Sequence, residues 1–533
     1  MEQVKVPKGS EAKAKYHLSQ LRKMFARAND HAFLQMIWAI DALQDDREEA
    51  AAQYLKNYPK AAAQSTFTSP YAIHRWELET LLIQLFLTPK QEIASGANLV
   101  LDCAQFESMR ETINRVRKLE DVESAVYLKV RGVFMEMHRI AQRQFHWQHG
   151  YYNLPHLYRY SYIYGQGKCG EYFERTYGIP ITDLTFVGFA LFAAHQRKPW
   201  LQQQLGIQEL ELTADLVKRA MPLLALSTED ARARTVAFNA QMAEQNGGPL
   251  PTAYLPNVLR QFPLISTDED LTRFVAPIPE MLLMRITAGL YYDLVPGGAH
   301  LLNDANDRFE QYCVDFITAL MPRFATSRSY HYGPKGTGFD SPDVLIKDGG
   351  KLVVVGDCKA TKLSYLAQFA ESPFDAAKQQ YDQIAKGVFQ AWRYYSHVRR
   401  GIADAEVAND SYVMIFTLDW FLFMSRELKA KVVEEAKALA DKDGQITDVD
   451  CRHVVFCTAH ELEGVLPIAT EDTFLAALKA TQDEKFKTWQ FREVYRDCTP
   501  EKPPRKDYPF KLDGVLPWWR RTQDLIETFE TKD

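Results

Sequence analysis

Residues 342–360 read PDVLIKDGGKLVVVGDCKA, and this stretch decides the fold of the C-terminal part of the chain. Two runs rich in valine, leucine and isoleucine flank a pair of glycines, which is the pattern of a β-hairpin. Side chains in a strand alternate between its two faces, so Asp357 and Lys359 point to the same side of the second strand. The hairpin therefore presents an acidic and a basic group together near the end of that strand.

The length of the turn determines on which face Asp343 lies. A three-residue loop, 348–350, places Asp343 opposite Val355 and on the same face as Asp357. A two-residue turn would shift the register by one residue and send Asp343 to the other face. We expect the three-residue loop. Diagonal cross-strand neighbours then have Cβ atoms roughly 7–8 Å apart, which is close enough for two carboxylates to converge on one ion.

Two carboxylates and an amine in this arrangement suit metal-dependent hydrolysis of a phosphodiester. The carboxylates repel each other unless a cation lies between them, and hard oxygen ligands suit Mg²⁺ or Mn²⁺. The metal would lower the pKa of a bound water, while Lys359 would hold that water or the scissile phosphate. The backbone carbonyl of Cys358 is a further candidate ligand. The alternative is an exposed hairpin whose Asp and Lys side chains form only a solvated surface pair.

Amphipathic helices are predicted on both sides of this hairpin in the sequence. In the first, apolar residues recur at helical spacing from Phe309 to Leu320, and Glu310 lies beside them as a candidate third carboxylate. In the second, apolar residues recur from Phe374 to Tyr395. The opposite side of the second helix carries residues able to contact phosphates and base edges, namely Gln379, Gln383, Lys386, Gln390, Arg393 and His397. Solvent exposure alone is the other explanation of that polar side.

Residues 300–400 resemble the PD-(D/E)xK nuclease superfamily, which includes restriction endonucleases and junction resolvases. The order of the motifs matches: a helix with Glu310, then PD at 342–343, then DxK at 357–359, and then a helix bearing glutamine. The segment 390–394, QAWRY, is also similar to the QxxxY motif of the exonuclease-type branch. The chain has aspartate where glutamate is commoner in the DxK motif.

The resemblance implies a role for each matching residue. The metal ligands would be Asp343, Asp357 and Glu310, and Lys359 would act in catalysis. Gln390 and Tyr394 would contact the substrate or position the site. Three other glutamines of the same helix compete with Gln390 for that role, namely Gln379, Gln380 and Gln383.

Composition limits how the chain could bind nucleic acid. It has 533 residues, enough for two or three domains, and a formal net charge of −6. That charge excludes a generally basic coat, so any contact with nucleic acid must be a local basic patch. The candidate residues for the patch are Lys335, Lys359, Lys362, Lys386, Arg393, Arg399 and Arg400.

Cysteine usage and hydropathy bear on the compartment. The seven cysteines lack CxxC spacing, which favours reduced thiols and a cytoplasmic protein. No run approaches the roughly 18 apolar residues of a membrane span, and the N-terminal segment lacks the apolar core of a signal peptide. We therefore expect neither secretion nor a membrane partner.

Tyrosines are concentrated in segment 151–173, which also contains Arg159. Such a composition is able to stack on bases, whereas burial in a helical core is the other explanation. Four histidines lie in or near this segment, but no acid or cysteine completes a known zinc pattern. No zinc site is therefore predicted from His138, His146, His149 and His156.

The periodicity of the whole chain predicts an α+β or α/β protein in three parts. Residues 1–205 form a mainly helical domain that recognises substrate or a partner, and residues 206–298 form a helical connection. Residues 299–533 form the nuclease-like domain, a restriction-endonuclease-like mixed sheet flanked by helices, with a helical extension at its C-terminal end. Within that extension, 473–497 is expected to be one long helix.

These observations together predict a cytoplasmic, Mg²⁺-dependent deoxyribonuclease. DNA is favoured because most members of the resembled superfamily act on it, and a role in bacterial defence against foreign DNA or in repair is consistent with the large helical addition. Two alternatives remain: a catalytically inactive module that binds nucleic acid or protein on the same fold, and a nuclease directed at RNA. Because a free nuclease would be toxic, we also expect restraint by a regulatory protein partner or by self-assembly.

Overall fold

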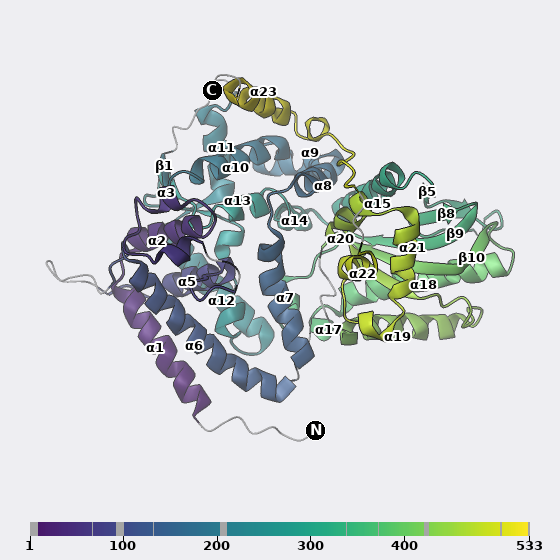
Figure 1. Cartoon of the computed structure of the whole chain (residues 1–533), viewed down its shortest axis with the longest axis horizontal. Helices are drawn as coiled ribbons and strands as arrows, with labels where there is room; N and C mark the ends of the chain where they lie inside the picture. Colours follow the sequence, from purple (N-terminus) through teal and green to yellow (C-terminus); the bar gives the residue numbers. More distant parts are fainter. Residues whose placement is uncertain are drawn as a thin grey trace.

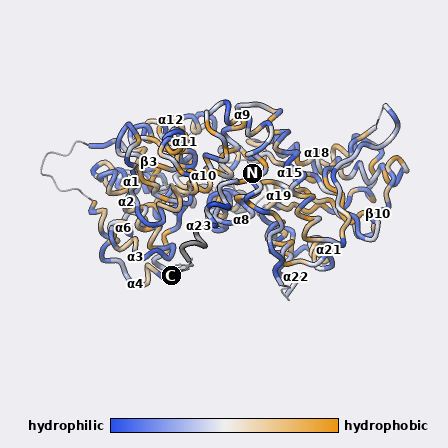
Figure 2. The backbone as a smooth tube through the Cα atoms, turned by 90° about the horizontal axis from the view of Figure 1, so that it is seen from above, coloured by the Kyte–Doolittle hydropathy of each residue, from blue (hydrophilic) through white to orange (hydrophobic). Residues whose placement is uncertain are grey.

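The computed structural model describes residues 9–64, 66, 68–91, 101–131, 133–202, 211–336, 338–370, 373–419, 426–500 and 504–530. Helices dominate the N-terminal part, and a five-stranded mixed sheet lies in the C-terminal half (Figure 1). The prediction of a mixed α and β protein is therefore confirmed. Seen from above, the two parts lie side by side along the long axis, and apolar segments run through both (Figure 2).

The N-terminal part is built from helices whose ends follow local sequence signals. Asn29 caps α2 by accepting a hydrogen bond from the backbone N–H of Ala32, and Thr213 and Ser227 cap α11 and α12 in the same way. The helices are α1 (Ser10–Arg27), α2 (Asp30–Leu43), α3 (Glu48–Ala51), α4 (Lys60–Ala63), α5 (Arg75–Leu87), α6 (Phe106–Arg131), α7 (Val133–His149), α8 (Leu154–Tyr164), α9 (Gly167–Tyr177), α10 (Ile181–His195), α11 (Ala214–Leu224), α12 (Thr228–Asn246), α13 (Glu280–Arg285) and α14 (Leu290–Leu294). Among the described residues no single helix is long and apolar enough to cross a membrane, and only the bent pair α9 and α10 reaches that length when counted together.

A small sheet interrupts the region predicted to be a helical connection. Its order is β1-β4-β3-β2, and each strand has three residues: β1 (Trp200–Gln202), β2 (Ala225–Ser227), β3 (Leu264–Ser266) and β4 (Arg273–Val275). Three residues are too few to show the period-two alternation by which a strand is recognised, so the sequence does not reveal these strands. Short 3₁₀ turns, η2 (Thr252–Tyr254) and η3 (Val258–Arg260), follow α12.

The C-terminal sheet has the order β11-β10-β9-β8-β5. The pairs β5–β8 and β8–β9 are antiparallel, whereas β9–β10 and β10–β11 are parallel. Its elements and their neighbours are α15 (Ala299–Leu320), β5 (Ala325–Arg328), β6 (His331–Tyr332), β7 (Phe339–Asp340), β8 (Val344–Asp348), β9 (Lys351–Lys359), α16 (Tyr365–Phe369), α17 (Pro373–Ala376), α18 (Lys378–Arg399), β10 (Glu406–Thr417), α19 (Arg426–Asp443), β11 (Val454–Thr458), α20 (Ala459–Val465), α21 (Glu471–Ala480), α22 (Phe491–Cys498) and α23 (Trp518–Glu530).

Helices cover both faces of this sheet, as the amphipathic patterns predict. The apolar stripe of α15 packs on one face, in a core that continues into the N-terminal helices. The stripe of α18 packs on the other face, where α19 lies beside it and a second, separate core forms. Because both faces are buried there, β9 and the second half of β10 read as nearly continuous apolar runs rather than as alternating ones.

The turn between β8 and β9 differs from its prediction, yet Asp343 still lies on the predicted face. Asp348 pairs with Lys351, so the turn has two residues, Gly349 and Gly350, both with positive φ. The expected three-residue loop is therefore wrong. A β-bulge at Val353 adds one residue to β9, and beyond it Val344 pairs with Gly356.

The bulge cancels the register shift that the shorter turn introduces. The next position along β8, Asp343, consequently continues the register toward Asp357 rather than toward Val355. Val353 and Val354 both join the core on the α15 side, so the predicted alternation is wrong for Val353. It holds from Val354 to Lys359.

The C-terminal extension is broken where one long helix was expected. Residues 473–497 form α21 and α22, separated by a turn that contains the 3₁₀ segment Glu484–Phe486, so that prediction is wrong. The buried residues Phe474 and Phe491, one from each helix, stack edge to face with ring centroids 5.6 Å apart. Packing of the two helices against each other is more favourable here than continuing the polar stretch TQDEK as a helix.

Candidate active site

Asp357 lies in the middle strand of the sheet, under α18. The residue is 2% exposed, and β8 and β10 pair with β9 on its two sides. Gly387 of α18 passes directly over the carboxylate, since a Cβ at this glycine would be only 2.2 Å from Asp357 Oδ2. The absence of a side chain at Gly387 therefore makes room for the carboxylate of Asp357.

Lys359 lies two residues further along the same face and forms an ion pair with Asp357. Its Nζ also donates to the carbonyl oxygen of Cys358 at 3.3 Å. Burial opposes the charge on this amine, but the carboxylates of Asp357 and Asp343 outweigh that effect and raise the pKa of Lys359 above its ordinary value. The lysine is therefore held as a cation at the end of β9.

Asp343 carries the most perturbed carboxyl of this cluster. Its Oδ2 accepts a hydrogen bond from the backbone N–H of Cys358 at 2.7 Å. Burial, followed by repulsion from Asp357 and Glu310, raises the pKa of Asp343 to about 8, although Lys359 and the Cys358 hydrogen bond act in the opposite direction. Burial and the two neighbouring acids therefore outweigh Lys359 at Asp343.

Glu310, predicted as a third carboxylate, lies on α15, which packs on the sheet face opposite to α18, and it is linked to the two aspartates through its charge. Asn306, one turn earlier, donates to Glu310 Oε1 at 2.7 Å, and Arg328 of β5 donates to Oε2 at 3.1 Å. Burial raises the pKa of Glu310, and Asp357 is among the charges that add to the rise. Asn306 also accepts from the backbone N–H of Ala360 at 3.0 Å, which ties α15 to the end of β9.

The donor chemistry of this cluster fits a hard divalent cation. Carboxylate oxygens are the ligands Mg²⁺ prefers, and a cation would relieve the repulsion that raises the pKa of Asp343. As they stand, the described residues include no group of three or more His, Cys, Asp and Glu side chains arranged to hold a metal ion. Oxygens of all three acids already accept hydrogen bonds from Lys359, Cys358, Asn306 and Arg328.

Cys358 contributes its backbone and not its side chain. The thiol is fully buried on the opposite face of β9, next to Cys313 of α15, and burial raises its pKa well above the ordinary value. Its carbonyl oxygen, a predicted ligand, accepts from Lys359. The residue therefore links the two aspartates through the main chain.

The predicted substrate-contacting residues of α18 separate into two groups. Gln383 and Gln390 lie four residues before and three after Gly387, so they extend along the helix face that crosses Asp357. Tyr394 follows one turn later, but it is buried, and its hydroxyl bonds that of Tyr330 at 2.8 Å. Gln390 is exposed and Gln383 is half-buried, so both amides remain candidates.

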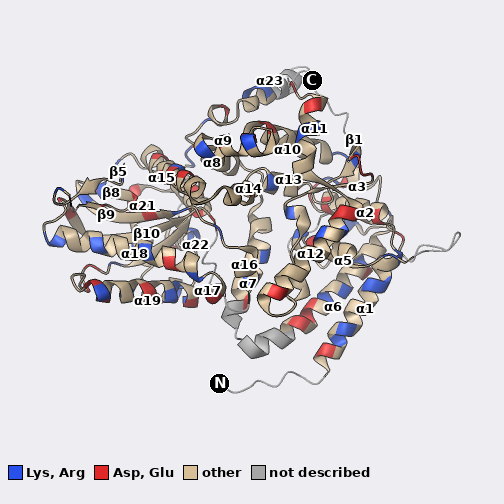
Figure 3. Ribbon diagram, turned by 180° about the vertical axis from the view of Figure 1, so that it is seen from behind, with Lys and Arg blue, Asp and Glu red and all other residues tan. Residues whose placement is uncertain are grey.

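The basic candidates also differ in position. Lys386 is exposed, and the half-buried Arg393 lies over the rings of Phe339 and Phe389, at 5.5 Å from each centroid. In Figure 3 the ribbon of α18 carries segments coloured for Lys and Arg, and that of α19 carries residues of both signs. Lys362 is placed elsewhere: it is buried and forms an ion pair with Asp419 at 2.7 Å. Lys362 is therefore not part of the predicted basic patch, and its assignment to substrate binding is wrong.

Sequence reasoning missed three residues that shape the cluster, namely Asn306, Arg328 and Gly387. Asn306 precedes Glu310 by four residues, and this spacing predicts that both lie on one side of the helix. Gly387 interrupts a well-formed helix, and an interior glycine usually has a packing reason. No sequence pattern indicates the contact of Arg328 with Glu310.

The tyrosine-rich segment packs in the core rather than forming an open platform. Tyr160 and Tyr164 are buried, and Tyr158 stacks on Phe510 with ring centroids 4.9 Å apart. Arg159 is buried in an ion pair with Glu463 of α20. This segment therefore joins the helical part to the sheet.

Comparisons with models of protein families, with curated proteins and with solved structures found no match to this chain. The case for a function therefore depends on the geometry of the site itself.

Proposed function

We propose that this protein is a metal-dependent nuclease that hydrolyses phosphodiester bonds, with DNA as the substrate. The observation that carries the proposal is the convergence of Asp343, Asp357 and Lys359 on one sheet face, with Glu310 close enough to influence the acid pKa values. A mixed sheet with α15 on one face and α18 on the other supports a restriction-endonuclease-like fold.

In this mechanism Asp343 and Asp357 would hold the cation, with Glu310 as the third acid. The cation would supply Lewis-acid polarisation of the phosphate and a lowered pKa for water. Lys359, whose ammonium lies at the end of β9 beside Asp357, would face the phosphate and stabilise the negative charge that develops on the phosphoryl oxygens.

The reaction adds one water across the phosphodiester. The water oxygen forms a bond to phosphorus and gives up a proton to solvent, the bond from phosphorus to the leaving sugar oxygen breaks, and the leaving alkoxide takes a proton from solvent. Gln383, Gln390 and Lys386 lie on or beside the α18 face that crosses the site, so they would contact the strand next to the scissile bond.

The test is cleavage of supercoiled plasmid, linear duplex DNA and single-stranded RNA by the purified chain with Mg²⁺ or Mn²⁺. Asp357→Asn and Lys359→Met should each lower the cleavage rate by at least about 100-fold, as expected for groups that act in the transition state. The matched control is Lys437→Met, which breaks an exposed ion pair with Asp448 and should cleave like the unchanged protein.

Each substrate separates one alternative from the proposal. Full activity of both Asp357→Asn and Lys359→Met would refute the site. Binding of DNA without cleavage under any metal would favour an inactive binding module on the same fold. Faster cleavage of RNA than of DNA would favour the RNA-directed enzyme. The role in defence or repair and the regulatory partner stay predictions.

A further inference from the structure

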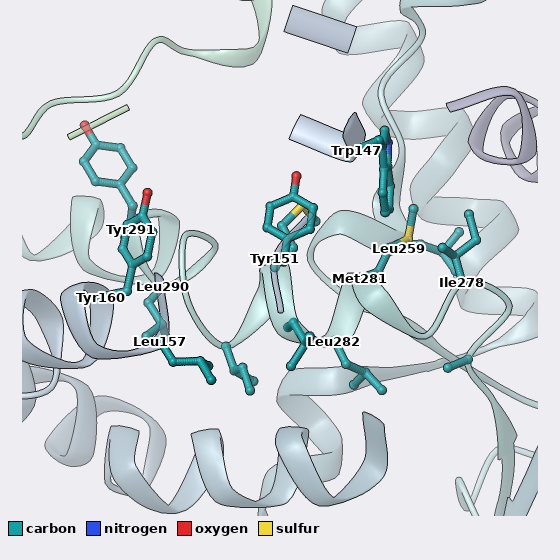
Figure 4. Packing of buried hydrophobic residues seen from close by; sticks show 14 of the residues in the cluster. Trp147, Tyr151, Leu157, Tyr160, Leu259, Ile278, Met281, Leu282, Leu290 and Tyr291 are labelled. Carbon is teal, nitrogen blue, oxygen red and sulfur yellow. The ribbon is translucent and has the colours of Figure 1, made fainter. Parts of the chain in front are cut away.

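A cavity lies away from the acidic cluster, between the N-terminal helices and the ends of β9 and β10. Its volume is about 500 Å³, within the range of roughly 300–1,000 Å³ typical of small-ligand sites. It is lined by α7, α12, α14, α16 and the turn η3. Figure 4 labels Tyr151, which lines the cavity, among buried residues of the core, including Met281 and Leu282 of α13.

Aromatic rings reach this cavity from several directions. Phe238 comes from α12, Tyr292 from α14 and Tyr365 from α16. Phe238 and Tyr365 lie with ring centroids 5.9 Å apart, and the hydroxyl of Tyr365 is fixed by a 2.8 Å hydrogen bond to the carbonyl oxygen of Leu255. Tyr292 is 48% exposed even though it belongs to the wall, because its ring borders the open space. With ring planes of Phe238 and Tyr365 tilted by 58°, this wall gives a planar ligand aromatic surface from more than one side.

The charges deep in the cavity are already neutralised within the protein. Lys362 pairs with Asp419 at 2.7 Å, and Arg260 pairs with Glu79 at 2.8 Å. Burial opposes ionisation of Asp419, but Lys362 and hydrogen bonds from Lys362 and Tyr160 outweigh it and keep its pKa below the ordinary value. A ligand inside the cavity therefore meets dipoles rather than a free charge. An uncharged ring with polar edges suits it better than an ion or a pure hydrocarbon.

The mouth of the cavity carries amides and one cation. Gln241 and Gln261 are exposed lining residues, and neither makes a side-chain hydrogen bond with the described residues. An amide offers a donor and an acceptor side by side, which matches the edge of a nucleobase. Arg234 is also exposed there, with its guanidinium 4.8 Å from the centroid of the Phe262 ring. It has no ion pair within the described part of the chain, so its N–H groups are able to donate hydrogen bonds to a phosphate.

We propose that this cavity binds a nucleobase, with the base against Phe238, Tyr292 and Tyr365, and with its phosphate at Arg234. The base belongs either to a free nucleotide or to a nucleic-acid strand, since both present the same ring and phosphate. This inference does not depend on the nuclease proposal, because none of these residues belongs to the acidic cluster.

The experiment measures binding to the purified full-length chain by calorimetry. The probes are the common nucleosides, their 5′-monophosphates and a short single-stranded oligonucleotide. Tyr292→Leu should weaken binding about 10-fold or more, since stacking of a base on an aromatic ring contributes that much. Arg234→Gln should weaken monophosphate binding and leave nucleoside binding unchanged. Tyr16→Leu, at a tyrosine of α1 that is 59% exposed, is the matched control and should bind like the unchanged chain.

The outcomes distinguish a free nucleotide from a nucleic-acid strand and show which result would overturn the proposal. Saturable binding of monophosphates supports a free nucleotide, and binding of the oligonucleotide alone supports a base within a strand. If Tyr292→Leu does not fold, Gln241→Ala at the exposed mouth takes its place and should also weaken binding. The proposal is overturned if no probe saturates the protein, or if a folded cavity variant binds as tightly as the control. Either result leaves the cleavage experiment unaffected.

Discussion

Replacing Gly387 by alanine tests how closely α18 controls the acidic cluster. A Cβ at this position would lie 2.2 Å from Oδ2 and 2.8 Å from Cγ of Asp357. Ordinary contact begins near 3.4 Å, so the atoms must separate by about 1.2 Å, the difference between 3.4 and 2.2 Å. Asp357 is part of a strand paired on both sides, which leaves the carboxylate and the helix as the parts that move.

This displacement should affect catalysis far more than stability. Overpacking costs about 1–3 kcal/mol, while alanine is favoured over glycine inside a helix by about 1 kcal/mol. The free energy of unfolding should therefore fall by only about 0–2 kcal/mol. A carboxylate moved by about 1 Å should lower the cleavage rate by about 100-fold.

Two measurements on Gly387→Ala are needed, the urea midpoint and the rate of plasmid cleavage with Mg²⁺. Gly248→Ala is the control, because its Cβ would meet no atom within 4 Å and its φ is not in the left-handed region. Unchanged cleavage by a folded Gly387→Ala variant would refute the reasoning, since the carboxylate would then tolerate displacement. A collapse of stability without selective loss of rate would assign Gly387 to packing alone.

Three further predictions follow from buried charges. Burial and the neighbouring acids raise the pKa of Asp343 from 3.8 to about 8, so the folded state loses stability as the pH rises through that window. Asp343→Asn should therefore be more stable than the unchanged chain at pH 9. Mg²⁺ should raise the melting temperature of the unchanged chain only. Equal shifts with Mg²⁺ in both would contradict a metal at Asp343. Burial lowers the pKa of His146 and His149 to about 4, so the folded protein is fully stable above pH 6.5 and loses stability as the pH falls toward 4. The urea midpoint of His149→Gln should therefore fall less steeply between pH 7.5 and pH 5 than that of a variant at the exposed His300. Parallel curves for the two variants would exclude this cause. Lys362→Met strands the buried carboxylate of Asp419 and should cost about 3–5 kcal/mol in urea unfolding, and a change as small as that of Lys437→Met would show that the pair is solvated.

The hairpin shows what the sequence could predict and what it could not. Alternation along β9 correctly places Asp357 and Lys359 on one face, because it depends only on the strand itself. The pairing of β8 with β9 depends on turn length and on the bulge at Val353, and neither has a local signal among consecutive valines. Two errors, in the turn and in the unrecognised bulge, cancelled for Asp343.

The rest of the site follows the same division. Helical periodicity correctly places Glu310 in α15 beside the apolar stripe, whereas Arg328 comes from a strand whose pairing no local pattern reveals. Lys362 was assigned to an exposed patch because its charge suggested solvent, but its partner Asp419 lies 57 residues further along the chain. Such long-range partners are outside the reach of periodicity arguments.

The bulge at Val353 is what allows a two-residue turn and a facing pair of aspartates in the same hairpin. If Val353 stayed in the chain but took part in regular pairing, Asp343 would face Gly356, and its carboxylate would lie on the far side of the sheet from Asp357. Deleting Val353 outright removes the one unpaired residue, so the two aspartates stay opposite each other. The acidic cluster should therefore survive the loss of this valine but not a rearrangement that straightens the bulge and keeps it.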